Sequence, residues 1–175
     1  INIVYTIGFL QTFAIPSISR QLKNSEKIVT HCKKRDEDTR TVLFHLLLHG
    51  PQEGAGKAAI NYMNDMHRRY PIRNEDYLYV LGIYVILFAD WCERGFAWRK
   101  LTELEKTAWL EGWKQIAKEM GIREVPESYS DFREYMSSYE QSQLHYCAEN
   151  EELAKIYLDM AVRRYPIYKR AWARW

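Results

Sequence analysis

Apolar side chains recur every three to four residues through most of this chain, and that spacing predicts α-helices. Stretches in which apolar and polar residues alternate, as they do in half-buried β-strands, are nearly absent. The 175 residues, of which 47% are hydrophobic, are enough for one domain with a sizeable core. We therefore predict an all-α fold, a single-domain bundle of about six to eight helices that spans residues 1–175.

Residues that start and stop helices mark most of the predicted boundaries. Thr102 and Glu105 form a capping box, and Gly121 supplies the stop for the helix that they open. The other predicted helices cover residues 3–13, 17–22, 39–48, 53–70, 74–95, 130–146 and 150–166, with Ser17, Asn74, Ser130 and Asn150 as N-terminal caps and Pro166 as the last stop.

The charge pattern narrows the range of partners. The 25 basic and 23 acidic residues are interspersed along most of the chain and give a net charge of +2, so a nucleic-acid partner is not expected. Only residues 163–174 are locally basic, with aromatic residues between the charges. That stretch suits a solvated terminus best, and it would also suit a membrane surface with anionic lipid or a protein partner in an assembly.

Cysteine usage and hydropathy bear on the compartment. The three cysteines are far apart and form no Cys-x-x-Cys pair, which argues against a disulfide framework or a zinc site and predicts a reducing, intracellular compartment. The longest apolar run, residues 77–89, is shorter than the roughly 20 residues that cross a bilayer, and it predicts a buried helix. Because the chain begins at Ile1, we expect an N-terminus that is truncated or processed.

Motifs for several kinds of chemistry are missing. No Glu-x-x-His occurs, which argues against a di-iron bundle, and no complete phosphate-binding loop occurs. His45 and His49, one helical turn apart, would bind a metal ion together with Glu53, but that pattern is weak. The 13 tyrosines and 6 tryptophans suit a bundle that encloses a flat hydrophobic cofactor or a lipid-like ligand.

His67 is the best candidate for a metal-binding side chain. Helical spacing places it on one face with Asn64, Met63 and Ile60, so the imidazole shares a largely apolar surface. A buried neutral imidazole binds iron or a similar metal through its free nitrogen, or it is a core residue that donates one hydrogen bond. The residues alone leave both interpretations open.

Five segments of the chain carry a resemblance to known proteins. The segments are residues 12–19 (TFAIPSIS), 35–39 (RDEDT), 61–72 (NYMNDMHRRYPI), 74–79 (NEDYLY) and 98–106 (WRKLTELEK). In order and spacing they resemble the oxygenase family of MpaB and the rubber oxygenases. The likeness covers roughly residues 9–140 and looks closer to the fungal MpaB-like branch than to the latex-clearing bacterial branch.

The resemblance implies a haem-type pocket and a set of site residues. Family members are all-α proteins, and the rubber oxygenases hold haem b through one histidine, which places His67 as the cofactor-binding metal ligand. It also places Arg35 and Thr39 at the family's Arg-x-x-x-Thr pair, as cofactor-binding and catalytic residues. Arginine would neutralise a propionate or polarise bound oxygen, and threonine would hydrogen-bond the distal ligand.

The implied function is that of a haem b-dependent oxygenase acting with dioxygen on an unsaturated, isoprenoid- or lipid-like small molecule. Two departures from the bacterial branches are visible: Asp38 stands where the latex-clearing enzymes carry a lysine, and residues 79–82 replace a Trp-Val-His-Ala-like stretch. Two alternatives stay open. One is a non-catalytic helical subunit or scaffold of a larger assembly at an internal membrane, and the other is a metal-independent lipid-binding bundle.

Overall fold

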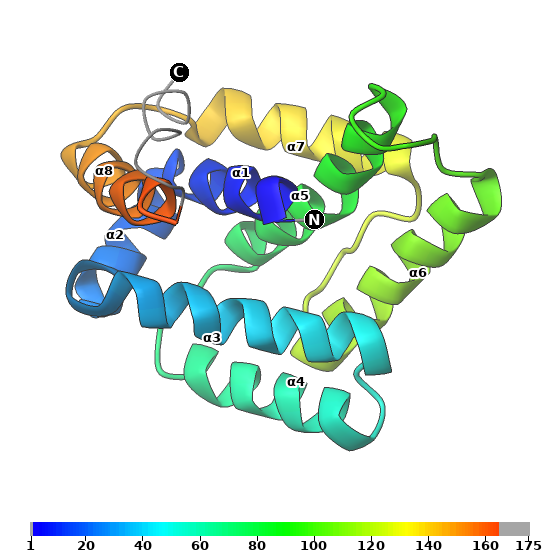
Figure 1. Cartoon of the computed structure of the whole chain (residues 1–175), viewed down its shortest axis with the longest axis horizontal. Coiled ribbons are helices and arrows are strands. Elements are labelled where there is room, and N and C mark those ends of the chain that lie inside the picture. The colour runs from blue at the N-terminus through cyan, green and yellow to red at the C-terminus, as the bar shows by residue number, and fades with distance from the viewer. Residues whose placement is uncertain (1, 165–175) are drawn as a thin grey trace.

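Eight helices and no strand make up residues 2–164, the part of the chain that the computed structural model describes (Figure 1). The all-α prediction is therefore confirmed, and the number of helices falls within the expected range. In chain order they are α1 (Asn2–Phe13), α2 (Pro16–Asn24), α3 (Lys27–His49), α4 (Gly54–His67), α5 (Asn74–Glu93), α6 (Glu103–Met120), α7 (Tyr129–Gln143) and α8 (Ala148–Val162).

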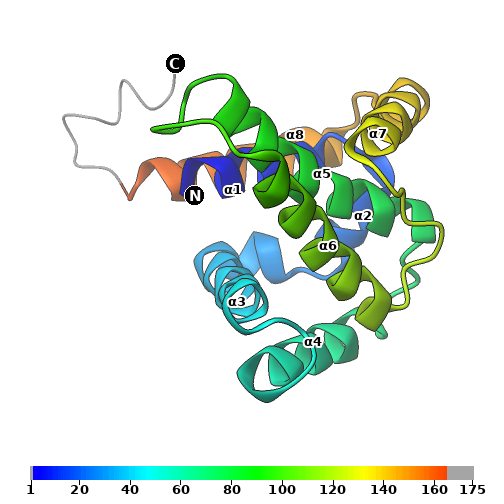
Figure 2. The same ribbon diagram turned by 90° about the vertical axis from the view of Figure 1, so that its right-hand side faces the viewer.

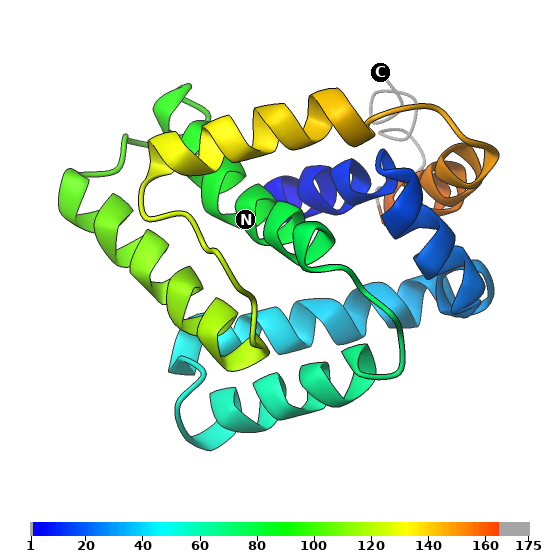
Figure 3. The ribbon, with the colours of Figure 1, turned by 180° about the vertical axis from the view of Figure 1, so that it is seen from behind.

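Helix α5 is the centre of the fold. It contacts α1, α6 and α7, and it contributes the largest share of the main hydrophobic core (Figure 3). The predicted buried helix at residues 77–89 is confirmed, since Tyr79, Ile83 and Val85 are at most 1% exposed. A second, smaller core joins α1, the start of α3, and α8 around Phe13, Ile28 and Tyr157.

Helices α3 and α4 form a hairpin, and they lie below α5 and α6 in Figure 2. The turn between them is tight because a Cβ atom at Gly56 would lie 1.6 Å from the carbonyl oxygen of Gly50. Glycine is therefore required at position 56 for this close approach. The turn fixes α4 alongside α3, the two helices that carry His67 and the Arg35–Thr39 pair.

Locally encoded boundaries agree best with the structure. Thr102 and Glu105 form the predicted capping box, and Gly121 ends α6 in the left-handed conformation with φ 71°. Helix α7 is corrected: its capping box uses Ser128 with Asp131 rather than starting at Ser130, and the helix ends at Gln143. An aspartate in the third helical position is a less familiar capping signal than glutamate, which explains the two-residue error.

The starts of α2 and α8 also differ from the prediction. Helix α2 begins with Pro16 in its first turn rather than with Ser17 as a cap. Helix α8 begins after Cys147, because Asn150 is used elsewhere: its amide donates to the carbonyl oxygens of Ala14 at 3.1 Å and His145 at 2.9 Å.

Helix α3 shows the largest difference, because it begins at Lys27 rather than at Thr39. Its first half is rich in charged residues and has no continuous apolar stripe, so the periodicity that marks other helices is missing. Pairs one turn apart, Lys33 with Glu37 and Lys34 with Asp38, support it instead. The helix bends at His31, where the backbone leaves helical geometry.

Some expectations fall at the edges of the described chain. The predicted helix stop at Pro166 and most of the basic stretch 163–174 lie outside the described residues. Across residues 2–164, no helix combines the length and the apolar character needed to span a bilayer. Cys32, Cys92 and Cys147 are free thiols.

Candidate active site

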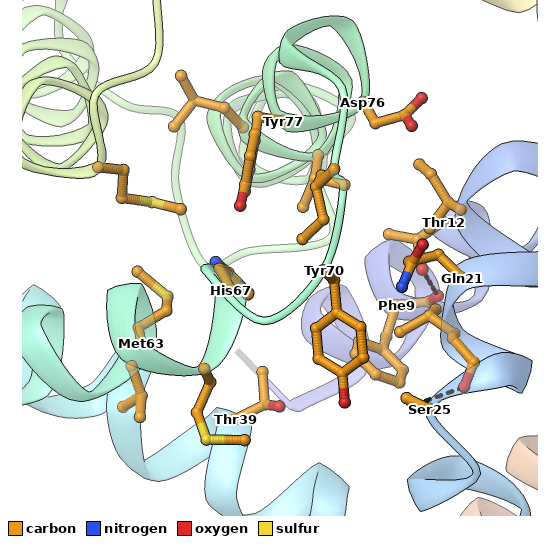
Figure 4. Close-up of a pocket in the computed structure, with 18 of the residues that line it drawn as sticks. Phe9, Thr12, Gln21, Ser25, Thr39, Met63, His67, Tyr70, Asp76 and Tyr77 are labelled. Carbon is orange, nitrogen blue, oxygen red and sulfur yellow. Dashed lines mark hydrogen bonds between the residues drawn. The ribbon is translucent and has the colours of Figure 1, made fainter.

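A cavity of about 370 Å³ lies between the α3–α4 hairpin and the helices α1, α2, α5 and α6. This volume lies in the range typical of small-molecule sites. Most of the lining is apolar or aromatic, with polar groups concentrated toward α2 and the start of α5 (Figure 4). His67, Arg35 and Thr39, the three residues expected at a site, all line this one cavity.

His67 is the last residue of α4, and its side chain is half-buried. Its Nδ1 atom is buried and has no hydrogen-bond partner within residues 2–164. Burial disfavours the charged imidazolium, and together with the nearby positive charge of Arg35 it lowers the pKa of His67 to about 4. The imidazole is therefore neutral near pH 7, which is the form that ligates metals.

Arg35 and Thr39 lie one turn apart on α3 and are hydrogen-bonded to each other. The Arg35 guanidinium donates to the Thr39 hydroxyl oxygen, and that hydroxyl donates to the Arg35 backbone carbonyl at 2.9 Å. In Figure 4, Thr39 lies across from His67 on the α3 side of the cavity. The pair thus presents a cation and a hydroxyl, held in a fixed relation, to the space beside the imidazole.

Aromatic side chains from α5 and α6 form much of the remaining wall. Tyr77 lies 5.5 Å from His67 between ring centroids, and its ring is tilted by 56° (Figure 4). Burial raises the pKa of Tyr77, so its phenol stays protonated and can donate a hydrogen bond. Farther in, Tyr84 stacks on Trp113 with centroids 5.2 Å apart, and the indole Nε1 of Trp113 is buried without a partner in the described chain.

A polar cluster closes the cavity where α2 meets α5. Asp76 accepts hydrogen bonds from Ser17 at 2.9 Å, from Arg73 at 2.8 Å and from the Tyr139 hydroxyl. Because each partner comes from a different segment, the carboxylate links α2, α7 and the loop before α5. These groups satisfy one another, as buried polar groups generally must.

Behind the Arg35–Thr39 pair lies a buried carboxylate that the sequence did not single out. Asp36 is 1% exposed and accepts hydrogen bonds from Arg40 at 2.8 Å, from Tyr157 at 2.7 Å and from Arg164. Burial alone would raise the pKa of Asp36, but these three donors hold it below its ordinary value. The charged residue therefore anchors α3 to α8.

The structure does not support the weaker candidate metal site, which was His45 and His49 with Glu53. The rings of His45 and His49 stack with centroids 5.8 Å apart. Over the described residues, no group of three or more histidine, cysteine, aspartate or glutamate side chains is placed to hold a metal ion. His67 lies in a different environment, a cavity with a single imidazole, as a one-histidine cofactor site would require.

One family of known proteins matches this chain. The family described as "ER-bound oxygenase mpaB/B'/Rubber oxygenase, catalytic domain" matches residues 7–175, nearly the whole chain. No curated protein and no solved structure matches this chain. The family description covers the MpaB and rubber-oxygenase branches together, so the closer likeness to the fungal branch stays a prediction. The chain belongs to the MpaB and rubber oxygenase family and is an oxygenase catalytic domain.

Proposed function

We propose that this domain is a haem b-dependent oxygenase that uses dioxygen to oxidise an unsaturated, isoprenoid- or lipid-like chain. One observation carries the proposal: a neutral imidazole, with one buried nitrogen lacking a hydrogen-bond partner, stands in the wall of a largely apolar cavity beside an arginine and a threonine. The same cavity would accept the hydrocarbon chain of the substrate.

The residues of the cavity fit a haem. Haem is flat and mostly apolar, and it needs a neutral imidazole for its iron and cations or hydrogen-bond donors for its propionates. His67 offers the imidazole, and an unpartnered buried nitrogen is a group that coordination would satisfy. Arg35 offers a cation. Met63, Val80 and Ile116 are among the apolar side chains that line the space.

Each of these residues would have a distinct task. His67 would hold the iron, and when bound the haem would supply the activation of dioxygen. Arg35 would place a fixed positive charge beside the reacting groups, and Thr39, oriented by its bond to Arg35, would offer a hydroxyl at a constant position. The neutral phenol of Tyr77 would donate a hydrogen bond from the side of α5. The apolar walls would bind the chain and exclude water.

Absorption spectroscopy tests the cofactor directly. Protein purified from haem-supplied cells should show a Soret band, and His67→Ala should lose it. His45→Ala is the matched control, because His45 also has a buried Nδ1 without a partner among residues 2–164 but does not line this cavity. A wild-type protein without bound haem would refute the proposal, and a band that survives His67→Ala would remove His67 as the ligand.

We also propose that this domain binds a protein partner at one surface. Phe44, Leu47 and Leu48 near the end of α3 are 60%, 47% and 61% exposed, and exposed apolar patches often mark partner sites. Elution from size-exclusion chromatography in a larger assembly would support such a partner, and elution as a monomer would contradict it. We also propose a reducing intracellular compartment, on the strength of the three free thiols, with membrane association as a further proposal.

A further inference from the structure

The cavity has two chemically different ends. Met63 and Tyr77 lie at one side of His67, and Gln21 and Ser25 of the α2 segment lie at the other (Figure 4). The first end is bounded by apolar and aromatic side chains of α4, α5 and α6. The α2 end is polar, and Lys27, the first residue of α3, lines it two positions after Ser25. A ligand that fills the cavity therefore meets an apolar environment at one end and a polar one at the other.

Charges along the cavity wall do not balance. Three basic residues and two acidic residues line it, not counting the neutral His67, which leaves a net charge of +1. Both carboxylates already have ion-pair partners, Asp76 with Arg73 at 2.8 Å and Asp38 with Lys34 at 3.2 Å. The surplus is therefore cationic, and a ligand that complements it carries a negative charge.

Lys27 and Gln21 carry the side chains at the α2 end that can still bind a ligand. Both side chains are half-buried, and neither has a hydrogen bond or an ion pair with another described residue. In contrast, the hydroxyl groups nearby are used: Ser25 donates to the Leu22 carbonyl at 2.6 Å, and Thr12 donates to the Phe9 carbonyl at 2.7 Å. An ammonium and a carboxamide next to each other offer donors suited to a carboxylate.

We propose that the cavity binds a lipid-like ligand that ends in a carboxylate, with the carboxylate at Lys27 and Gln21 and the hydrocarbon chain extending toward His67. This inference deepens the proposed function, since it names the class of molecule that occupies the same cavity. It places the polar end of the ligand away from the imidazole. The part of the chain that reaches His67 is then the part exposed to oxidation.

Binding of two matched lipids to the haem-free protein tests the inference. Oleic acid and oleyl alcohol share one hydrocarbon chain and differ only in the polar end, and calorimetric titration measures both. The wild type should bind oleate about tenfold more tightly, the value of one charge-assisted contact. Lys27→Met should lower the affinity for oleate by about tenfold and leave that for the alcohol nearly unchanged. Gln21→Leu should act in the same direction with a smaller change.

Lys33→Met is the matched control. Lys33 lies on the same helix, but it is exposed and pairs with Glu37 rather than lining the cavity. This variant should keep the wild-type preference, and the unfolding temperature of each variant reports that its fold is intact. Equal affinity of the wild type for the two lipids would overturn the proposal, and so would a loss in Lys27→Met that is the same for both.

Haem titrations separate this inference from the proposed function and from a second source of carboxylate, the haem propionates. A Soret band without a preference for oleate would overturn the lipid assignment alone, whereas a preference for oleate without a Soret band supports it and refutes the cofactor alone. The ratio of the affinity for haem to the affinity for its dimethyl ester should be the same in Lys27→Met as in the wild type. If Lys27→Met weakens only haem and leaves the lipid preference intact, the carboxylate at Lys27 belongs to the cofactor and the lipid assignment fails.

Discussion

Two buried carboxylates, Asp36 and Asp76, have similar partners and different surroundings. Each accepts hydrogen bonds from an arginine and a tyrosine, and the two residues are 1% and 6% exposed. Asp76 lines the cavity, whereas Asp36 lies behind the helix turn that carries Arg35 and Thr39. Two buried carboxylates therefore hold the helices of the site together, one in the cavity wall and one outside the cavity.

The partners of the two carboxylates also differ in their access to water. The side chain of Arg40, beside Asp36, is 21% exposed, and that of Arg73, beside Asp76, is 48% exposed. A cation that loses its carboxylate regains hydration more easily when it is exposed. The anchor at Asp36 should therefore be the more sensitive of the two.

The largest expected effect is that of Asp36→Ala. It leaves Arg40 without its close carboxylate and the Tyr157 hydroxyl without its acceptor in the smaller core. We expect a loss of about 3–5 kcal/mol in the free energy of unfolding, the usual result of breaking a buried ion pair. Urea unfolding followed by circular dichroism measures it. A loss below about 1 kcal/mol would mean that the carboxylate is not an anchor.

Asp76→Asn should cost less, about 1–3 kcal/mol, because Arg73 turns to solvent and the amide keeps one acceptor for the Tyr139 hydroxyl. The same urea experiment compares the two variants directly. A loss for Asp76→Asn that equals or exceeds that of Asp36→Ala would break the comparison. It would show that the loss in free energy of unfolding depends more on the position of the carboxylate in the cavity wall than on the exposure of its arginine partner to water.

His67 is a third polar group, half-buried in the cavity wall, and its protonation should make the free energy of unfolding depend on pH. Its folded pKa of about 4 is below the ordinary value of 6.5, so the unfolded chain binds more protons between these two values. The stability that His67 contributes is fully present above pH 6.5 and is lost as the pH falls toward 4. Between pH 7 and pH 5 the wild type should lose about 1–2 kcal/mol more than His67→Gln. Equal losses would show that the imidazole is not buried in the neutral form.

The same residues show what the sequence could predict. Helix α6 was predicted with its ends because Thr102, Glu105 and Gly121 are local signals that act within one turn. The first half of α3 was missed because its stability comes from charge pairs such as Lys34 with Asp38, which look the same in an exposed loop. Local chemistry is visible in the sequence, and tertiary support is not.

The residues of the candidate site also fall into those that the sequence predicted and those that it did not. His67 was singled out from helical spacing, and Arg35 and Thr39 were predicted from the family resemblance alone. All three line one cavity. Asp36 was not found, because its burial depends on Tyr157, which is 121 residues away along the chain. In sequence, Asp36 followed by Arg40 looks like any exposed pair one turn apart. Only the fold separates a structural anchor from a surface ion pair.

The smallest expected effect, and the sharpest test of the comparison, comes from removing one hydroxyl at each anchor. Tyr157→Phe removes the donor to Asp36, and Tyr139→Phe removes the donor to Asp76. Each should cost about 1 kcal/mol, the typical net value of one hydrogen bond. The loss should be larger for Tyr157→Phe, because its side chain is 0% exposed and no water can replace the hydroxyl, whereas Tyr139 is 8% exposed.

Combining Tyr157→Phe with Asp36→Asn in a double-mutant cycle isolates the coupling between the two groups. A coupling near zero would mean that the Tyr157 hydroxyl does not stabilise the carboxylate, and Arg164 and apolar contacts would then link this end of α8 to the Arg35–Thr39 turn.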